Sequence, residues 1–263
     1  HTKKDIGNLC LSGIMIMKKK ILDHIKENKF QDFSKDILPK LIKKNIKIYA
    51  YNTREYVKDV GTPGRIYTVK KHLKILKYKN GSLKTKIPAI FLDRDGVINK
   101  EYPNKHYQNP LKIIEGAFDA VKKINEKGFL SVIVTNQSAV AKGVVTIDKV
   151  ERDHKKLEYL FGVHGSYFDR IYYCPYYPIK GFKGEIKKYK KKSLLRKPNN
   201  GMLLNAINDL NIDTKKSYMV GDRNTDYLAA KKTGVKFLIV GNKLKIKGKK
   251  NFINLKQAIN SIL

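Results

Sequence analysis

From residue 87 onward, short apolar stretches alternate with amphipathic ones, and this alternation restricts the fold more than any other feature of the chain. We expect strands at 89–92, 129–134, 168–173, 217–220 and 235–240. We expect helices at 116–127, 146–161, 201–210 and 225–232. Strands that alternate with helices favour an α/β fold with a Rossmann-like parallel sheet and helices on both faces. Ligands of such sheets bind at the carboxyl ends of the strands.

The first part of the chain has a different pattern. Strands are expected at 9–17, 46–51 and 56–60, and helices at 18–27, 34–44 and from 64 to about 77. The run 9–17 is too short to span a bilayer and lacks a signal-peptide cleavage site, so it indicates a buried strand. A polar, turn-rich stretch at 79–86 predicts a boundary between a domain at 1–84 and a second at 87–263.

The chain carries 56 basic and 23 acidic residues, a formal net charge of +33. The basic residues are mostly lysines spread along the whole chain, whereas nucleic-acid binding favours clustered arginines. The charge therefore indicates a compositional bias that attracts small anions, and we expect no nucleic-acid partner. Cys10 and Cys174 lie far apart in the sequence, so we expect no disulfide framework. We also expect no membrane segment, and both expectations favour the cytoplasm.

Two carboxylates, Asp93 and Asp95, follow the apolar run that ends at Leu92. Carboxylates separated by one residue can share a magnesium ion and still have different roles, and Gly96 allows an immediate turn. On its own, such a pair is also compatible with a solvated turn.

Polar residues follow the later strands in the same way. They are Thr135, Asn136, Gln137 and Ser138, then Arg196 and Lys197, then Asp222, Arg223 and Asp226. Singly, these residues are typical of caps and turns. Their recurrence at successive strand ends predicts that they share one edge of the sheet.

The second part of the chain resembles phosphatases of the haloacid dehalogenase superfamily, above all the heptose bisphosphate phosphatases and their relatives, the histidinol phosphatases. The resemblance covers residues 87–263 and rests on the segments FLDRDGVIN (91–99), TNQSAVAKG (135–143), IYYCPYYP (171–178), RKP (196–198), GMLL (201–204) and YMVGDRNTD (218–226). It implies the haloacid dehalogenase fold. Without a long insertion after Ile98 or Gln137, we expect no large cap and an open site.

The resemblance also implies a mechanism. Asp93 would attack phosphorus and form an aspartyl phosphate, while Asp95 would protonate the leaving group and then activate water. Magnesium would be bound by the Asp93 side chain, the Asp95 backbone carbonyl and the Asp222 side chain.

The remaining roles follow by similarity. Asp226 would support the metal ligands, and Thr135 and Lys197 would stabilise the phosphoryl oxygens. The residues expected to bind substrate are Glu101, Tyr102, Pro103, Asn104, Asn136, Gln137, Ser138, Arg196 and Arg223.

One segment departs from the family pattern. Many relatives have a zinc loop Cys-Pro-His-His-Pro that is completed by Cys-x-Cys before Arg-Lys-Pro. Here the loop is CPYYP (174–178), and Ser193 and Leu195 stand at the later cysteine positions. Because a structural zinc site needs four ligands, we expect no zinc.

The first part resembles the C-terminal half of sugar-phosphate nucleotidyltransferases. The segments concerned are LSGIM (11–15), FSKDILP (33–39) and YVKDVGTP (56–63). Asp59 would be a metal ligand by similarity, although an Asp before Gly is also typical of a tight turn. The Gly-rich nucleotide loop is absent, so we interpret residues 1–84 as a small α/β remnant of a fusion, whose missing N-terminal half is an expected partner.

A fusion of phosphatase and nucleotidyltransferase joins consecutive steps of heptose activation for surface polysaccharide and lipopolysaccharide. It favours D-glycero-D-manno-heptose 1,7-bisphosphate, a small phosphorylated sugar, as the substrate. Histidinol phosphatase, nucleic-acid 3′-end phosphatase and a non-catalytic scaffold remain as alternatives.

Overall fold

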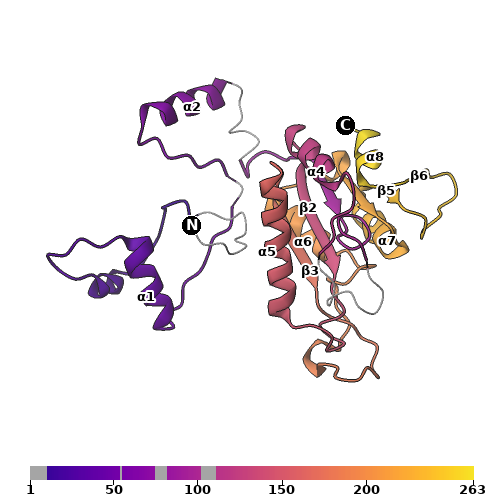
Figure 1. The fold of residues 1–263 in the computed structure, drawn as a ribbon, viewed down its shortest axis with the longest axis horizontal. Helices are drawn as coiled ribbons and strands as arrows, with labels where there is room; N and C mark the ends of the chain where they lie inside the picture. The colour runs from indigo at the N-terminus through magenta and orange to yellow at the C-terminus, as the bar shows by residue number, and fades with distance from the viewer. Residues whose placement is uncertain (1–10, 54, 75–81, 102–110) are drawn as a thin grey trace.

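The protein, seen here as a computed structural model, is described for residues 11–53, 55–74, 82–101 and 111–263. Its main unit is a parallel sheet between two layers of helices (Figure 1). Within the described residues the sheet has six strands in the order β3-β2-β1-β4-β5-β6, and every pairing is parallel. The strands are β1 (Ala89–Leu92), β2 (Leu130–Asn136), β3 (Arg170–Cys174), β4 (Tyr218–Gly221), β5 (Lys236–Val240) and β6 (Asn251–Phe252). The predicted α/β fold with a parallel sheet is confirmed.

The helices cover both faces of the sheet. They are α4 (Ala117–Glu126), α5 (Ile147–Val163), α6 (Gly201–Leu210), α7 (Asn224–Thr233) and α8 (Leu255–Asn260), with short 3-10 turns at Lys187–Tyr189 and Thr214–Lys216. Alternate side chains of a strand point to opposite faces. In β1, Ala89 and Phe91 pack with α6 and α7, whereas Ile90 and Leu92 pack with α4, α5 and α8. All four are fully buried, which explains why this strand is uniformly apolar.

The predicted elements of this unit agree with the structure, with ends that differ by about two residues at most. Two elements at the C-terminal end were not predicted, namely β6 and α8. A strand of two residues gives no alternation to detect. The start of α8 did carry a signal, because the Asn254 side chain accepts a hydrogen bond from Gln257 N at 3.1 Å.

The connection between β2 and α5, residues 137–146, contains no helix or strand. The connection from β3 to α6, residues 175–200, contains only the short turn Lys187–Tyr189. The connection after Gln137 carries no cap domain, as the sequence predicts, and the connection from β3 to α6 carries none either. The edge of the sheet is therefore covered by loops.

The strands predicted in the first part of the chain are wrong. Residues 11–17, 46–51 and 56–60 form no strand, and the predicted helix at 18–27 is reduced to a 3-10 turn, Lys19–His24. An apolar run becomes a strand only where a partner supplies hydrogen bonds and a packing face. The helix predicted at 34–44 is present as the π turn Phe33–Ile37 followed by α1 (Leu38–Lys43). The helix predicted from residue 64 is present as α2 (Pro63–Lys74).

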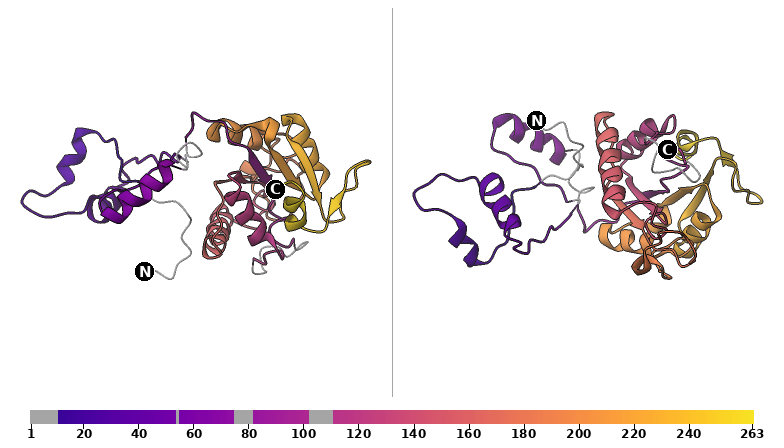
Figure 2. Two further views of the ribbon diagram at one scale, coloured as in Figure 1. Left: turned by 90° about the horizontal axis from the view of Figure 1, so that it is seen from above. Right: turned by 60° about the horizontal axis from the view of Figure 1, so that its bottom comes forward.

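Residues 11–53 and 55–74 lie beside the α/β unit as an extended arm (Figures 1 and 2). Of their described apolar side chains, Ile37 and Leu41 are the buried ones. Arg170 of β3 donates a hydrogen bond to the backbone oxygen of Asn52 at 2.9 Å. In the described part of the chain, no helix is long and apolar enough to cross a bilayer.

Phe161 of α5 is fully buried and packs its ring against Phe118 and Phe168, with centroids 4.6 Å apart in each pair. We expect Phe161→Ala to lower the free energy of unfolding by about 3–5 kcal/mol, since it removes a large core side chain. Tyr159, two residues earlier in α5 and 44% exposed, is the matched control, and Tyr159→Ala should change the free energy of unfolding by about 0.5 kcal/mol or less. Urea unfolding measures both, and equal losses would contradict this account of the core.

Candidate active site

Asp93 stands at the carboxyl edge of the sheet, directly after the strand β1. Its N–H donates to the carbonyl of Val220 at 3.0 Å, so the backbone stays in the sheet one residue beyond the strand. The residue is only 6% exposed. Burial raises the pKa of Asp93 to about 7, against the lowering effect of the Lys197 ammonium.

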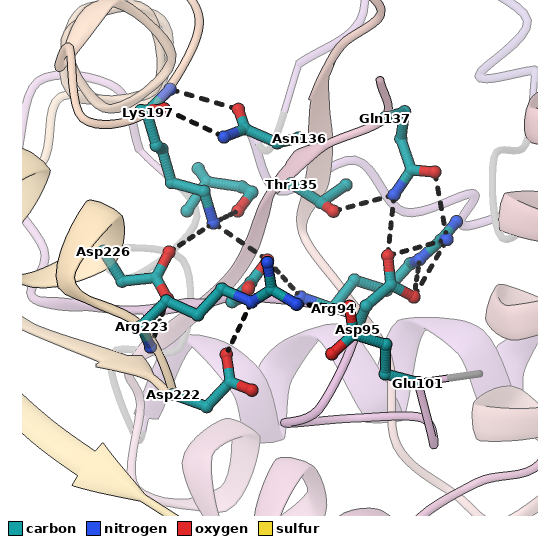
Figure 3. A network of polar contacts seen from close by, with 12 residues as sticks. Arg94, Asp95, Glu101, Thr135, Asn136, Gln137, Lys197, Asp222, Arg223 and Asp226 are labelled. Atoms are coloured by element: carbon teal, nitrogen blue, oxygen red, sulfur yellow. Dashed lines mark hydrogen bonds and ion pairs between the residues drawn. The ribbon is translucent and has the colours of Figure 1, made fainter. Parts of the chain in front are cut away.

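Lys197 places a buried ammonium among three oxygen atoms. Its Nζ lies 2.8 Å from Asp93 Oδ1 and 2.6 Å from Asp226 Oδ1, and it donates to Val134 O at 2.8 Å (Figure 3). Burial by itself lowers the pKa of Lys197, but the charges of Asp226 and Asp93 outweigh it and raise the pKa above its usual range. The ammonium is therefore charged and fixed.

The backbone of Lys197 is fixed as well. Its N–H donates to Asn136 Oδ1 at 3.1 Å, and Asn136 Nδ2 donates to its carbonyl at 3.0 Å. Both polar atoms of the Asn136 side chain thus join the end of β2 to the loop before α6. The substrate-binding role expected for Asn136 remains a prediction.

Asp226 supports this arrangement from the start of α7. Its carboxylate is fully buried, and Oδ2 accepts a hydrogen bond from Arg223 N at 3.1 Å, which caps the helix. A Cβ at Gly221 would lie 2.4 Å from Asp226 Cβ. Only glycine therefore lets this carboxylate approach the end of β4 and reach Lys197.

The carboxylates of Asp93, Asp222 and Asp226 offer oxygen atoms within 4.8 Å of one another. The Lys197 ammonium lies between Asp226 and Oδ1 of Asp93, so the second oxygen of Asp93 and the Asp222 carboxylate are left for a cation. The Oδ1 atom of Asp222 is buried and accepts no hydrogen bond from any described residue. A buried carboxylate oxygen without a donor fits a divalent metal, because hard cations take oxygen ligands.

Gly96 is required beside this pair. It has φ +89°, and a Cβ there would lie 2.4 Å from Asp222 Oδ2. The chain can turn after Asp95 and still leave room for the Asp222 carboxylate only without a side chain at this position.

Asp95 is surrounded by N–H donors. Arg94 donates to both of its carboxylate oxygens at 3.0 Å, Asn99 Nδ2 donates to Oδ1 at 2.9 Å, and Gln137 Nε2 donates to Oδ2 at 2.9 Å. Gln137 Nε2 also donates to Thr135 Oγ1 at 2.9 Å. The network fixes the Asp95 carboxylate relative to the end of β2 (Figure 3).

Arg94 is itself held by a buried histidine. Its side chain is 3% exposed, and Nη1 donates to His154 Nε2 of α5 at 3.2 Å. Burial, together with the charge of Arg94, lowers the pKa of His154 to about 3. The imidazole is therefore neutral and can accept this hydrogen bond.

Long, charged and partly exposed side chains lie at the rim of the site. Glu101 pairs with Arg223 and lies 2.6 Å from Lys243 Nζ, which also lies 2.7 Å from Asp222 Oδ2. The exposed fractions of the Arg223 and Lys243 side chains are 51% and 46%. Burial raises the pKa of Glu101, but hydrogen bonds from Lys243 and Arg223 outweigh it and lower the pKa.

The other predicted substrate residues are placed as follows. Arg196 is half-buried, and its Nη1 donates to the carbonyl of Tyr176 at 3.3 Å. Ser138 is half-buried in the loop after β2. Tyr102, Pro103 and Asn104 lie outside the described residues.

The profile of the HAD-hydrolase-like family matches residues 194–245. The D-glycero-beta-D-manno-heptose-1,7-bisphosphate 7-phosphatase of Vibrio cholerae serotype O1 is 41% identical over 148 residues, which is 56% of this chain and 77% of that protein. The enzyme of the same name from Haemophilus ducreyi is 44% identical over 149 residues, 56% of this chain and 79% of that protein. The chain belongs to the HAD-like phosphatase family.

Solved structures of HAD-like phosphatases share this fold. A D,D-heptose 1,7-bisphosphate phosphatase from B. bronchiseptica, complexed with magnesium and phosphate, has a TM-score of 0.57 at 24% identity and covers 66% of this chain and 97% of its own. A putative HAD-like phosphatase from Mesorhizobium loti has a TM-score of 0.58 at 27% identity and covers 67% and 88%.

Four residues of this phosphatase were not predicted to belong to the site: Arg94, Asn99, His154 and Lys243. Arg94 and Asn99 lie inside the segment 91–99, which the resemblance had already singled out. They were missed because the neighbouring Asp95 carboxylate was not expected to need fixed hydrogen-bond donors. His154 lies mid-helix and Lys243 in a lysine-rich run, and nothing in the sequence distinguishes them.

We expect Gln137→Leu to lower kcat by about ten- to a hundredfold, because the Asp95 carboxylate and the Thr135 hydroxyl lose the amide that holds them. Steady-state phosphate release measures the effect. Gln257→Leu, in α8, removes an amide outside the site and serves as the control. Unchanged kcat in the Gln137 variant would show that Asp95 does not depend on this network.

We expect Lys197→Met to destabilise the fold by about 3–5 kcal/mol near pH 8, because it leaves two buried carboxylates without their cation. The pKa of Asp93 is already raised to about 7, and loss of the ammonium raises it further. A raised carboxyl pKa lowers stability as the pH rises through it, so the loss should be smaller at pH 5.5. Urea unfolding at both pH values measures this, and an equal loss at both would contradict it.

Proposed function

We propose that the chain hydrolyses the 7-phosphate of D-glycero-beta-D-manno-heptose 1,7-bisphosphate with the help of Mg²⁺. The observation that carries the proposal is the meeting of Asp93, Asp222 and the buried Lys197 ammonium at one strand edge. The substrate rests on relatives of 37–44% identity that bear the name of this activity. The β anomer follows from the same names.

The chemistry is a double displacement at phosphorus. An oxygen of Asp93 forms a bond to phosphorus while the bond to the sugar oxygen breaks, and a proton from Asp95 goes to that leaving oxygen. Asp95 then takes a proton from water, whose oxygen attacks the aspartyl phosphate and releases Asp93. The donors around Asp95 hold it in place for both proton transfers.

Lys197 and Thr135 would stabilise the charge on the phosphoryl oxygens. Asp93, the Asp95 carbonyl and Asp222 would hold Mg²⁺, and the orphaned Asp222 Oδ1 fits this assignment. When bound, the metal supplies positive charge between the nucleophile and the phosphate. The Asp226 carboxylate keeps the Lys197 ammonium in position.

Arg196, Arg223, Glu101, Ser138 and Gln137 would bind the sugar and its second phosphate. Arg223 and Arg196 are half-exposed guanidinium groups near the same rim, which suits a doubly phosphorylated substrate. Tyr102, Pro103 and Asn104 belong to this proposal by resemblance alone.

Two further proposals rest on the sequence. A role in surface polysaccharide synthesis, in the cytoplasm, depends on the interpretation of residues 1–84 as a nucleotidyltransferase remnant. In the structure Asp59 accepts a hydrogen bond from Gly61 N at 2.9 Å and pairs with Arg65 in an exposed turn. Absence of zinc rests on the ligand count of residues 174–195.

Phosphate release should be measured with both anomers of the heptose bisphosphate, histidinol phosphate and a 3′-phosphorylated oligonucleotide. We expect a kcat/KM for the β anomer at least about a hundredfold above the other esters. A preference for histidinol phosphate or the oligonucleotide would replace the substrate assignment, and no turnover of any ester would favour a scaffold.

We expect Asp93→Asn to abolish turnover, because an amide cannot attack phosphorus, while the far-ultraviolet circular dichroism stays unchanged. Asp213→Asn, at an exposed turn before β4, is the matched control and should retain full activity. Activity that survives in the Asp93 variant would mean that another group is the nucleophile.

We expect Lys243→Met to tighten Mg²⁺ binding by about tenfold, because the ammonium 2.7 Å from Asp222 Oδ2 competes for the same carboxylate. Calorimetric titration of the free protein with MgCl₂ measures the change. Lys245→Met, two residues along the same loop, is the control. Weaker binding in the Lys243 variant would contradict the proposed competition.

A further inference from the structure

The loop that follows β3 lacks the donors of a structural zinc site. The positions that carry zinc ligands in the resembling relatives are occupied by Cys174, Tyr176, Tyr177, Ser193 and Leu195. Cys174 is a buried free thiol, and two tyrosines, a serine and a leucine do not complete a tetrahedral zinc site. Something other than this metal must organise residues 175–192.

A buried lysine lies at the centre of this loop. The Lys190 side chain is 2% exposed, and its Nζ lies 3.2 Å from Glu185 and donates to the carbonyl of Ile179. The same ammonium lies 5.2 Å from the ring centroid of Tyr177 and 4.7 Å from that of Phe182. A charged group is stable at this depth because a carboxylate, a carbonyl and two aromatic faces replace its water.

The loop after β2 joins the same rings. Lys142 Nζ lies 4.8 Å from the centroids of both Tyr177 and Phe182. The backbones are also in contact, since Ile186 N donates to Ala141 O at 3.1 Å. A Cβ at Gly143 would lie 1.8 Å from the carbonyl oxygen of Gly184, so the two loops can pack this closely only with glycine there.

Arg196 contacts one of these aromatic rings from the loop that carries Lys197. Its guanidinium carbon lies 4.7 Å from the Tyr177 centroid, and Nη1 donates to Tyr176 O at 3.3 Å. Among the described residues no carboxylate pairs with Arg196, and the nearby Arg223 acts on it as a like charge. The two guanidinium groups therefore suit a shared anion.

We propose that a cation–aromatic cluster replaces a metal as the organiser of this loop, and that Tyr177 is a positioning residue for Arg196. The cluster consists of Lys142, Tyr177, Phe182, Lys190 and Arg196. The cation–π contact with the Tyr177 ring and the hydrogen bond to Tyr176 O together hold the Arg196 guanidinium in place. Its remaining N–H groups bind the phosphate of the substrate that does not react. This last step rests on the proposed function.

Hydrogen–deuterium exchange of the full chain, with no substrate present, tests the cluster. We expect amide exchange in residues 175–197 to be unaffected by 1,10-phenanthroline, which removes zinc and leaves magnesium. Lys190→Met should speed this exchange by about tenfold or more, and Lys188→Met, whose ammonium lies over Tyr189 outside the cluster, should not. Faster exchange of the wild-type loop after chelation, or equal exchange in both variants, would overturn the cluster.

Kinetics test the positioning of Arg196. We expect Tyr177→Leu to raise KM for the heptose bisphosphate by about three- to tenfold, the size of a cation–π contact, with kcat within about twofold. Hydrolysis of p-nitrophenyl phosphate, which has no second phosphate, should be unchanged, and Tyr177→Phe should retain the wild-type KM. Equal losses on both substrates would overturn the positioning role.

A wild-type protein that does not hydrolyse the heptose bisphosphate would overturn the proposed function and, with it, the role of Arg196. The exchange measurement uses no substrate and still decides whether the cluster holds the loop. The two failures are therefore distinguishable.

Discussion

The buried ammonium of Lys197 is the interaction on which the rest of the site depends. It pairs with Asp93 after β1 and Asp226 in α7, and it donates to Val134 of β2, so one group joins three elements at the edge of the sheet. Each buried carboxylate would be costly alone. The ammonium makes their approach favourable, and Asn136 fixes the loop that carries it. The positions of Asp93 and of the start of α7 follow from this one charge.

The two aspartates after β1 have different surroundings. Asp93 is buried against one ammonium, and burial raises its pKa to about 7. Asp95 instead accepts hydrogen bonds from Arg94, Asn99 and Gln137. A neutral His154 holds Arg94 from behind, so the donors of Asp95 are themselves fixed. The two neighbouring carboxylates therefore lie in different electrostatic environments.

The excess of lysine is used in the fold as well as on the surface. Lys190 is buried between two aromatic rings, Lys142 joins a second loop to them, and Lys243 lies against Asp222. Each ammonium occupies a place where a loop or a carboxylate needs positive charge. A chain with a formal charge of +33 can therefore organise loops with lysine and aromatic side chains.

The sequence by itself determined the parallel sheet, the order of its elements as far as β5, and the strand ends that carry Asp93, Thr135 and Asp222, because these follow from apolar periodicity and from the residues next to it in the chain. Lys197 lies instead in the loop before α6, and folding brings it to the same edge. Only the tertiary structure decided that residues 11–17, 46–51 and 56–60 form no strands, since a strand depends on partners that local pattern does not specify. It also decided which groups His154, Lys243 and Lys190 contact. These contacts join residues far apart in the chain, from Arg94 to His154 and from Glu101 to Lys243, and folding alone brings them within hydrogen-bond distance.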